Sequence, residues 1–172
     1  MAVKKSRKIF KPLVFIASLI PLGWLVFLLY SDTTLGTKYM TADPVQKLDR
    51  ELGDWALIFI ILSLAVRPLA EILKKSELVA YRRMIGFFAF FYVCLHFSAY
   101  IGLNLQLDLD EFIKDVTKRN FITIGIINVI LLAPLVITST KGMIKRLGSK
   151  RWQKLHMLIY PIALLGVFHF FM

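Results

Sequence analysis

Residues 82–107 read RRMIGFFAFFYVCLHFSAYIGLNLQL, and this stretch decides the fold class. After the two arginines, no Asp, Glu, Lys or Arg occurs from Met84 to Leu107. That run exceeds the roughly 20 residues that a helix needs to cross the hydrocarbon layer of a bilayer. A soluble helix would instead alternate apolar and polar faces. The stretch therefore predicts a membrane-spanning helix.

Other runs of the same kind predict four more spans. One of them is short, because its uncharged run extends only from Trp55 to Val66 and is followed by Arg67 and Pro68. Apolar sequence continues beyond that proline, so we interpret a full span whose arginine snorkels to the membrane surface. The sequence, 58% hydrophobic, thus predicts an all-α, polytopic transmembrane helix bundle that forms a single domain over 1–172. The predicted spans are about 12–31, 53–69, 84–107, 120–140 and 155–172.

The charged residues lie mainly in the segments that connect the apolar runs, and their distribution among these segments predicts the topology. The net charge of +11 is typical of proteins that bind nucleic acids. The basic residues flank the apolar runs, however, and do not form one soluble basic face, so we expect no nucleic acid as partner. Most of the basic residues precede the first span or lie in 67–83 and 141–154. By the positive-inside rule the N-terminus is cytoplasmic and the C-terminus extracytoplasmic. The connector Asp32–Gly53 is then expected to be an acidic outer loop that caps the bundle or meets a partner. The first span is expected to be retained, because no small-x-small cleavage pattern follows it.

All three histidines, His96, His156 and His169, lie inside or at the mouth of apolar runs. An ionisable side chain inside a bilayer costs on the order of a few kcal/mol, so by default it marks a functional site. Neutral imidazole is also the ligand that haem iron most often takes from proteins. Cys94 is the only cysteine, which excludes an intramolecular disulfide and a cysteine-held zinc or iron–sulfur site. Any bound metal would depend on histidine.

Depth in the membrane predicts which histidines pair. At ~1.5 Å per residue, His96 lies roughly 20 Å beyond Arg83, and His169 lies roughly 22 Å beyond Lys154. Two imidazoles on one iron must lie at nearly equal depth, since each iron–nitrogen bond is only ~2 Å long. The parallel third and fifth spans meet this condition for His96 and His169, which we predict as axial haem ligands. His156 lies near the cytoplasmic surface, where it could ligate a second haem, contact a flavin or quinone, or face headgroups. Pro161 can kink or rephase the helix between His156 and His169.

Three sequence strings carry a resemblance to a known family. They are RRMIGFFAFFYVCLHFSAY (82–100), KRNFITIGIINVILLAPLVITSTKGMIKRLGSKRWQKLHMLIY (118–160) and ADPVQKLDRELGDWALIFIILSLAVRPLA (42–70). Together they resemble the MsrQ (YedZ) family, within the ferric reductase-like transmembrane superfamily. The distinguishing order is R-x-x-G, L-H, T-S and W-x-x-L-H, with a final histidine thirteen residues later. The resemblance covers nearly the whole chain.

The resemblance implies particular cofactors and site residues. Family members are haem-binding membrane subunits of a periplasmic methionine sulfoxide reductase system, so haem b is the expected cofactor. The superfamily implies two haem levels; His96 and His169 match the outer pair, and His156 matches one inner ligand. Arg82 stands where the other inner histidine is expected, which is a departure from the superfamily pattern. The family is also reported to use FMN, whose phosphate and ring would be bound by Arg82, Arg83, Trp152 and His156. The same residues could contact a quinone or a haem propionate.

The function that follows from the resemblance is electron transfer in a bacterial inner membrane. Electrons would come from the quinol pool or a cytosolic flavin reductase and leave to a periplasmic molybdopterin methionine sulfoxide reductase subunit. The chain would thus be an electron-transfer subunit of an oxidoreductase system and not the catalytic subunit. Alternatives are a stand-alone ferric or quinone reductase domain and a non-redox structural or transport protein whose histidines hydrogen-bond or relay protons. Family members usually continue into another span after His169, so a truncated or shortened chain is expected.

Overall fold

The computed structural model describes residues 2–172, and every regular element in that range is helical. In chain order these are α1 (Ala2–Leu35), α2 (Pro44–Ile72), the 3-10 segment η1 (Ser76–Tyr81), α3 (Arg82–Ala99), the π-helical segment η2 (Tyr100–Asn104), α4 (Leu109–Lys118), α5 (Asn120–Ile137), α6 (Lys141–Leu147), α7 (Ser149–His156) and α8 (Ile159–Phe171). Among the described residues, five helical stretches are long and apolar enough to cross a membrane: Phe10–Leu35, Pro44–Ile72, Ser76–Asn104, Asn120–Ile137 and Ser149–Phe171. The predicted all-α polytopic fold class is confirmed. Met1 of the predicted domain lies outside the described residues.

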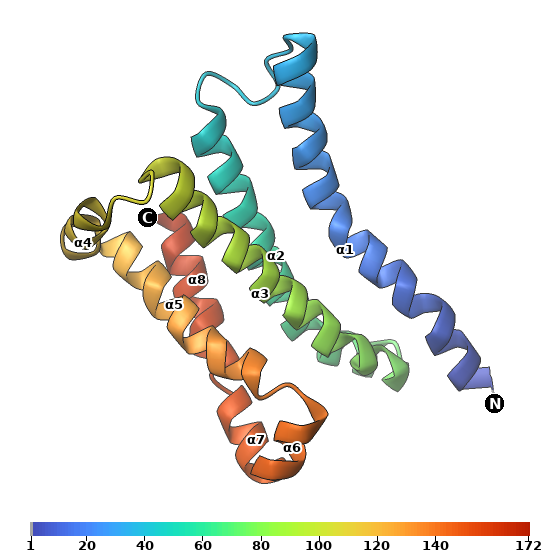
Figure 1. Cartoon of the computed structure of the whole chain (residues 1–172). Coiled ribbons are helices and arrows are strands. Elements are labelled where there is room, and N and C mark those ends of the chain that lie inside the picture. The colour runs from blue at the N-terminus through green and yellow to red at the C-terminus, as the bar shows by residue number, and fades with distance from the viewer. Residues whose placement is uncertain (1) are drawn as a thin grey trace.

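Two helix pairs form the body of the bundle (Figure 1). α2 packs along α3 and α5 packs along α8, and the pairs meet through contacts of α2 with α8 and of α3 with α5. α1 runs along the outside of the first pair. The N-terminus, α6 and α7 lie at one end of the bundle, whereas α4, the α1–α2 connection and the C-terminus lie at the other. The last turns of α3 and α8 therefore reach the same end.

Aromatic side chains fill the contact between α2 and α3. Phe59, Phe88 and Tyr92 are buried. The Phe59 ring stacks on Tyr92 with ring centres 5.1 Å apart and on Phe88 with ring centres 5.9 Å apart. Lipid tails are as apolar as these rings, so helix association in a membrane depends on close van der Waals packing and ring stacking, not on the hydrophobic effect.

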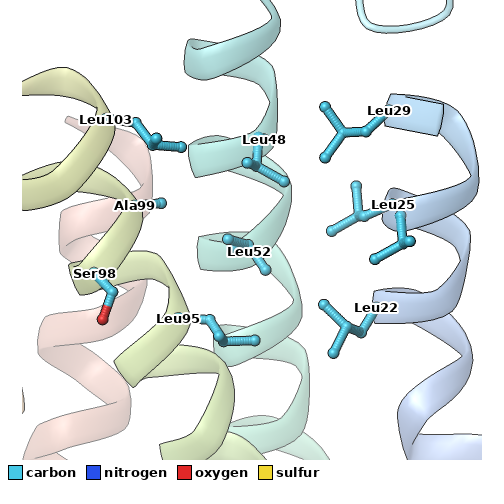
Figure 2. A pocket seen from close by; sticks show the side chains of 10 residues that line it. Leu22, Leu25, Leu29, Leu48, Leu52, Leu95, Ser98, Ala99 and Leu103 are labelled. Carbon is cyan, nitrogen blue, oxygen red and sulfur yellow. The ribbon is translucent and has the colours of Figure 1, made fainter. Parts of the chain in front are cut away.

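The Tyr92 hydroxyl connects α1 to this core. It donates to the Ser18 carbonyl at 2.9 Å and accepts the Leu22 N–H at 3.2 Å. Those two backbone groups are four residues apart and would bond each other in a regular helix, so the hydroxyl is inserted into the α1 hydrogen-bond ladder. Beside this contact, leucines of α1, α2 and α3 line an apolar cavity of about 360 Å³ (Figure 2). Among the described residues, the Tyr92 hydroxyl thus provides the polar contact between α1 and α3, at the edge of a loosely packed interface.

The connector after α1 is shorter than the predicted acidic loop Asp32–Gly53. α1 ends at Leu35 and α2 begins at Pro44. Asp43 caps α2 by accepting the N–H of Gln46, and proline at the first helical position completes a typical helix start. The predicted bounds of the loop were wrong because they placed the ends of both spans next to the charged residues. In the structure the charged first turns of α2 are helical.

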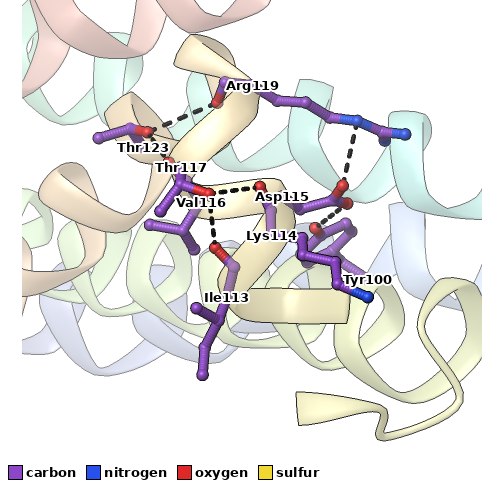
Figure 3. Close-up of polar contacts among 8 residues, drawn as sticks. All are labelled: Tyr100, Ile113, Lys114, Asp115, Val116, Thr117, Arg119 and Thr123. Atoms are coloured by element: carbon purple, nitrogen blue, oxygen red, sulfur yellow. Dashed lines mark hydrogen bonds and ion pairs between the residues drawn. The ribbon is translucent and has the colours of Figure 1, made fainter. Parts of the chain in front are cut away.

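A short amphipathic helix, α4, occupies the connector between the third and fourth spans. Its N-cap Asp108 accepts the N–H groups of the next turn. Asp115 is buried, accepts the Tyr100 hydroxyl at 2.7 Å and pairs with the Arg119 guanidinium at 3.1 Å (Figure 3). These contacts fasten α4 to the end of the third span. Its apolar residues Leu109 and Ile113 are exposed, which is typical of a helix that lies in the membrane interface.

Pro161 marks a break in the fifth span. α7 ends at His156 and α8 begins at Ile159, with Met157 and Leu158 in a turn between them. Proline in the first turn of a helix is tolerated because the N–H that it lacks would have no partner there. The interruption expected from Pro161 is present, and it separates the helix that carries His156 from the helix that carries His169.

Candidate functional site

His96, on α3, is held against the backbone of α2. Its Nδ1 atom lies 2.9 Å from the carbonyl oxygen of Asp49. The imidazole also lies over Gly53, where an added Cβ atom would be 3.2 Å from the ring atoms Cε1 and Nδ1. That separation is shorter than ordinary van der Waals contact. Glycine at this position therefore lets the ring approach the helix closely enough to bond the carbonyl.

His169, on α8, is held in the same way against α5. Its Nδ1 atom lies 2.8 Å from the carbonyl oxygen of Phe121. An added Cβ atom on Gly125 would be 3.1 Å from the Cε1 atom of the ring. The imidazole thus rests on a glycine and bonds a backbone carbonyl of the neighbouring helix.

The two contacts have the same geometry. We call the pair Asp49 and Gly53 the α2 notch and the pair Phe121 and Gly125 the α5 notch. In each, the carbonyl lies four residues before the glycine, so that both are on the same face of the helix. A helix carbonyl has a second lone pair that can accept a further hydrogen bond. The missing Cβ four residues later opens access to it. Both histidines therefore have an oriented ring.

The notches bring the two imidazoles close together at one end of the bundle. The ring centres of His96 and His169 are 6.2 Å apart, and the ring planes are inclined by 73°. An imidazole nitrogen bonds a metal at about 2 Å, so two rings on opposite sides of one ion have centres roughly 6 Å apart. Because each Nδ1 bonds a carbonyl, each Nε2 is left for a metal, and neither Nε2 has a hydrogen-bond partner in the part of the chain that the structure describes.

This donor set fits an iron held by two neutral imidazoles. Histidines that bind metals almost always donate the other ring N–H to a carboxylate or backbone carbonyl, which fixes the tautomer and the ring orientation. Both notches provide such an acceptor, and both contain a glycine where a Cβ would crowd the ring. On the α5 side an aromatic ring is adjacent, with the Phe121 ring centre 6.3 Å from that of His169. The residues present therefore meet the chemical requirements of bis-histidine haem.

One notch also contains a carboxylate. The Asp49 Oδ1 atom lies 3.0 Å from Nδ1 of His96, close to the carbonyl oxygen of the same residue. This Oδ1 atom is buried and, within residues 2–172, accepts no hydrogen bond of acceptable angle. The two side chains are 20% and 28% exposed, respectively. A negative charge therefore lies beside the His96 ring, whereas Phe121 occupies the corresponding position beside His169.

The structure places His156 in a different environment, at the other end of the bundle. Its ring packs on Trp152, with ring centres 4.1 Å apart. The Nε2 atom lies 3.2 Å from Oγ1 of Thr138, and that hydroxyl donates to the Pro134 carbonyl at 2.6 Å. The Thr138 oxygen is thus left to accept, so Nε2 carries the proton. Within the described residues Nε2 has no hydrogen-bond partner in His96 or His169, whereas in His156 it bonds Thr138.

The remaining predicted site residues gather near His156. Trp152 touches it and donates its indole N–H to the Thr138 carbonyl at 3.0 Å. Arg82 and Arg83 begin α3 at this end, and the charges of both act on the imidazole. The structure therefore assembles two separate clusters, one around His96 and His169 and one around His156.

Sequence reasoning missed Asp49, Gly53, Phe121 and Gly125. A glycine inside an apolar helical run was the available signal, because glycine in a helix costs about 1 kcal/mol relative to alanine and so often has a packing reason. The chain has nine glycines, however, and six of them have open space where a Cβ would be. Only the tertiary structure separates the two notch glycines from the rest.

Comparisons with known proteins agree with this arrangement. Residues 51–167 match the family described as "Ferric reductase like transmembrane component". The chain is 46% identical over 160 residues to "Protein-methionine-sulfoxide reductase heme-binding subunit MsrQ" of Herminiimonas arsenicoxydans, covering 93% of this chain and 71% of that protein. The corresponding protein of Rhodospirillum rubrum is 45% identical over 157 residues, covering 91% and 73%. "Magnetosome protein MamZ" of Paramagnetospirillum magneticum is 43% identical over 169 residues, which cover 98% of this chain and 26% of that longer protein.

Proposed function

Because this chain belongs to the MsrQ family of ferric reductase-like transmembrane proteins, we propose that it binds haem b between His96 and His169 and carries electrons across the membrane. The observation that carries the proposal is the 6.2 Å separation of two imidazoles whose Nδ1 atoms are both tied to carbonyls. Relatives that are 45% and 46% identical are named as haem-binding subunits. The single cysteine cannot form the C-x-x-C-H attachment of a c-type haem, so the haem would be held without covalent bonds.

A bound haem would supply a one-electron ferric–ferrous couple inside the membrane. His96 and His169 would hold it as axial ligands, and the α2 and α5 notches would orient both rings and keep both Nδ1 protons away from the metal. Phe121 and the apolar faces of the four inner helices would exclude water from the site. In this proposal residues 1–172 act as one ferric reductase-like domain.

The direction of transfer follows from the charge distribution. The basic segments at the start of α1 and around α6 and α7 lie at the end of the bundle opposite the C-terminus. The positive-inside rule assigns that end to the cytoplasm of a bacterium and the His96–His169 end to the periplasm. Electrons would thus enter near α7 and leave near α4, across the inner membrane.

The cluster of Arg82, Arg83, Trp152 and His156 would be the entry site. Two guanidinium groups suit a phosphate or propionate, and the Trp152 indole stacked on His156 offers a surface for a flavin or quinone ring. We propose His156 as a relay or contact at this point and not as a ligand equivalent to the outer pair, since Thr138 engages its Nε2 atom. FMN, the quinol pool and a cytosolic flavin reductase remain the proposed cofactor and donors.

The acceptor would be a periplasmic molybdopterin enzyme that reduces methionine sulfoxide, for which this chain is the membrane subunit. The proposal takes the system from the names of the relatives, which describe subunits of a protein-methionine-sulfoxide reductase. A purified chain in liposomes, supplied with a reductant at the donor side, should pass electrons to that enzyme faster than to soluble ferric chelates. Equal or faster reduction of free iron would instead indicate a stand-alone ferric reductase.

Absorption spectroscopy tests the haem assignment. The purified protein should show a Soret band and, when reduced, a b-type α-band. His96→Ala and His169→Ala should each lose the haem or convert it to a five-coordinate form, whereas His156→Ala should keep the low-spin spectrum. A wild-type protein without a Soret band, or a low-spin spectrum abolished by His156→Ala alone, would overturn the proposal.

A further inference from the structure

The two notches differ in one respect that sequence spacing does not reveal. The carbonyl that receives the ring proton belongs to Asp49 on α2 and to Phe121 on α5. In the α5 notch the side chain of that residue is a phenyl ring beside His169. In the α2 notch it is a carboxylate whose Oδ1 atom lies 3.0 Å from Nδ1 of His96. The same contact between a ring nitrogen and a helix carbonyl is thus accompanied by a charged side chain in the α2 notch and by an apolar side chain in the α5 notch.

The position of the Asp49 carboxylate is not explained by packing or by helix capping. Its Oδ1 atom is buried and, in the described part of the chain, has no donor other than the ring N–H that already points at the carbonyl. A buried oxygen without a donor costs free energy, and a carboxylate in such a place more so. The other ion pairs of the described chain join Arg67 to Glu71 and Arg119 to Asp115, so neither arginine is paired with Asp49. The imidazole of His96 is the group that the carboxylate faces.

We infer that Asp49 is a positioning and tuning residue that makes the two haem ligands unequal and lowers the reduction potential of the site. This inference rests on the haem binding proposed above. The negative charge of a carboxylate 3.0 Å from the ring nitrogen polarises the N–H group and makes the imidazole a stronger electron donor to the metal. Ferric iron carries one more positive charge than ferrous iron, so a stronger donor and a nearby negative charge favour the ferric state. His169, which bonds an uncharged carbonyl, remains an ordinary neutral ligand.

A low potential at this position has a functional consequence. The outer haem would give its electron away more readily, because the reduced state is less stable. The Asp49 carboxylate gives the α2 notch a negative charge, whereas the corresponding residue of the α5 notch is the uncharged Phe121, so the α2 notch makes the difference between the two ligands.

Asp49→Asn tests the inference with little structural change. The amide has the shape of the carboxyl group, and the backbone carbonyl that orients His96 is retained. Groups that bond a metal-binding histidine change affinity typically 10- to 100-fold. We expect the ferrous-to-ferric ratio at a fixed potential to rise about tenfold, which corresponds to about 59 mV for a one-electron couple. The measurement is a spectroelectrochemical titration of the purified holoprotein, with Glu51→Gln as control because it removes a charge from the same helix without contacting His96.

The outcomes distinguish a failure of the tuning role of Asp49 from a failure of haem binding itself. A potential that rises in Asp49→Asn and stays near the wild-type value in Glu51→Gln supports the tuning role. An Asp49→Asn protein that keeps its haem at an unchanged potential overturns it, while haem binding still stands. If Asp49→Asn fails to retain haem, Asp49→Glu decides, since a restored charge should keep the wild-type potential and a raised potential would contradict the inference. Wild-type protein without haem would overturn the proposed function itself.

Discussion

Replacing Gly53 by alanine tests whether the α2 notch positions the His96 ring. The new Cβ atom would lie 3.2 Å from Cε1 and Nδ1 and 3.6 Å from Nε2. Optimal carbon contacts are about 3.5–4.0 Å, so the ring must withdraw by a few tenths of an ångström. The 2.9 Å hydrogen bond to the Asp49 carbonyl lies across the same notch and would stretch beyond the usual limit of about 3.2 Å.

The free energies show where the effect will be measurable. Losing most of one hydrogen bond costs about 0.5–1.5 kcal/mol, while alanine in place of glycine in a helix gains about 0.8–1.0 kcal/mol. These contributions nearly cancel, so the free energy of unfolding should change little. The position of the metal-binding nitrogen has no such compensation. Groups that orient a ligand typically contribute 10- to 100-fold to metal affinity, and we therefore expect Gly53→Ala to lose haem about tenfold faster.

The assay is haem transfer from the detergent-solubilised protein to an excess of a soluble haem scavenger, followed by absorbance. Gly86→Ala is the matched control, because Gly86 lies in the same span as His96 and an added Cβ meets nothing within 4 Å. The control should release haem at the wild-type rate. Equal rates for Gly53→Ala and Gly86→Ala, together with an unchanged low-spin spectrum, would refute the claim that the notch positions the ring.

Two further outcomes follow from the contacts described above. Gly125→Ala should also accelerate haem release, because its Cβ would lie 3.1 Å from Cε1 of His169, and a wild-type rate in the scavenger assay would show that this ring is held by other means. Tyr92→Phe removes the hydroxyl that bonds the Ser18 carbonyl and the Leu22 N–H at 2.9 and 3.2 Å. Leaving buried groups unpaired costs about 1–3 kcal/mol, so unfolding in mixed detergent should show a loss of that size, and a wild-type midpoint would mean that α1 closes its own ladder.

Helix ends in this protein were less predictable than helix existence. Uncharged runs located the five apolar helices, because a bilayer admits few charges along a span. The same rule failed at Pro44, where a charged first turn continues the helix, and it left α4 unassigned because its polar face resembles a loop. Both helices have sequence signals in the capping residues Asp43 and Asp108. Charge alone therefore finds the membrane-embedded parts and underestimates the helices that extend beyond them.

The amino-acid sequence by itself determined the all-α membrane fold, the histidines available for a metal, and the expectation that His96 and His169 lie at equal depth. It could do so because composition, helical rise and the positions of the charges depend only on the order of residues along the chain. The tertiary structure alone decided which carbonyls receive the ring protons, which two of nine glycines admit the rings, and that a carboxylate lies beside only one of them. These features join residues about 45 positions apart on different helices, such as Gly53 with His96 and Gly125 with His169. Their geometry depends on how α2 packs on α3 and α5 on α8, which no local pattern specifies.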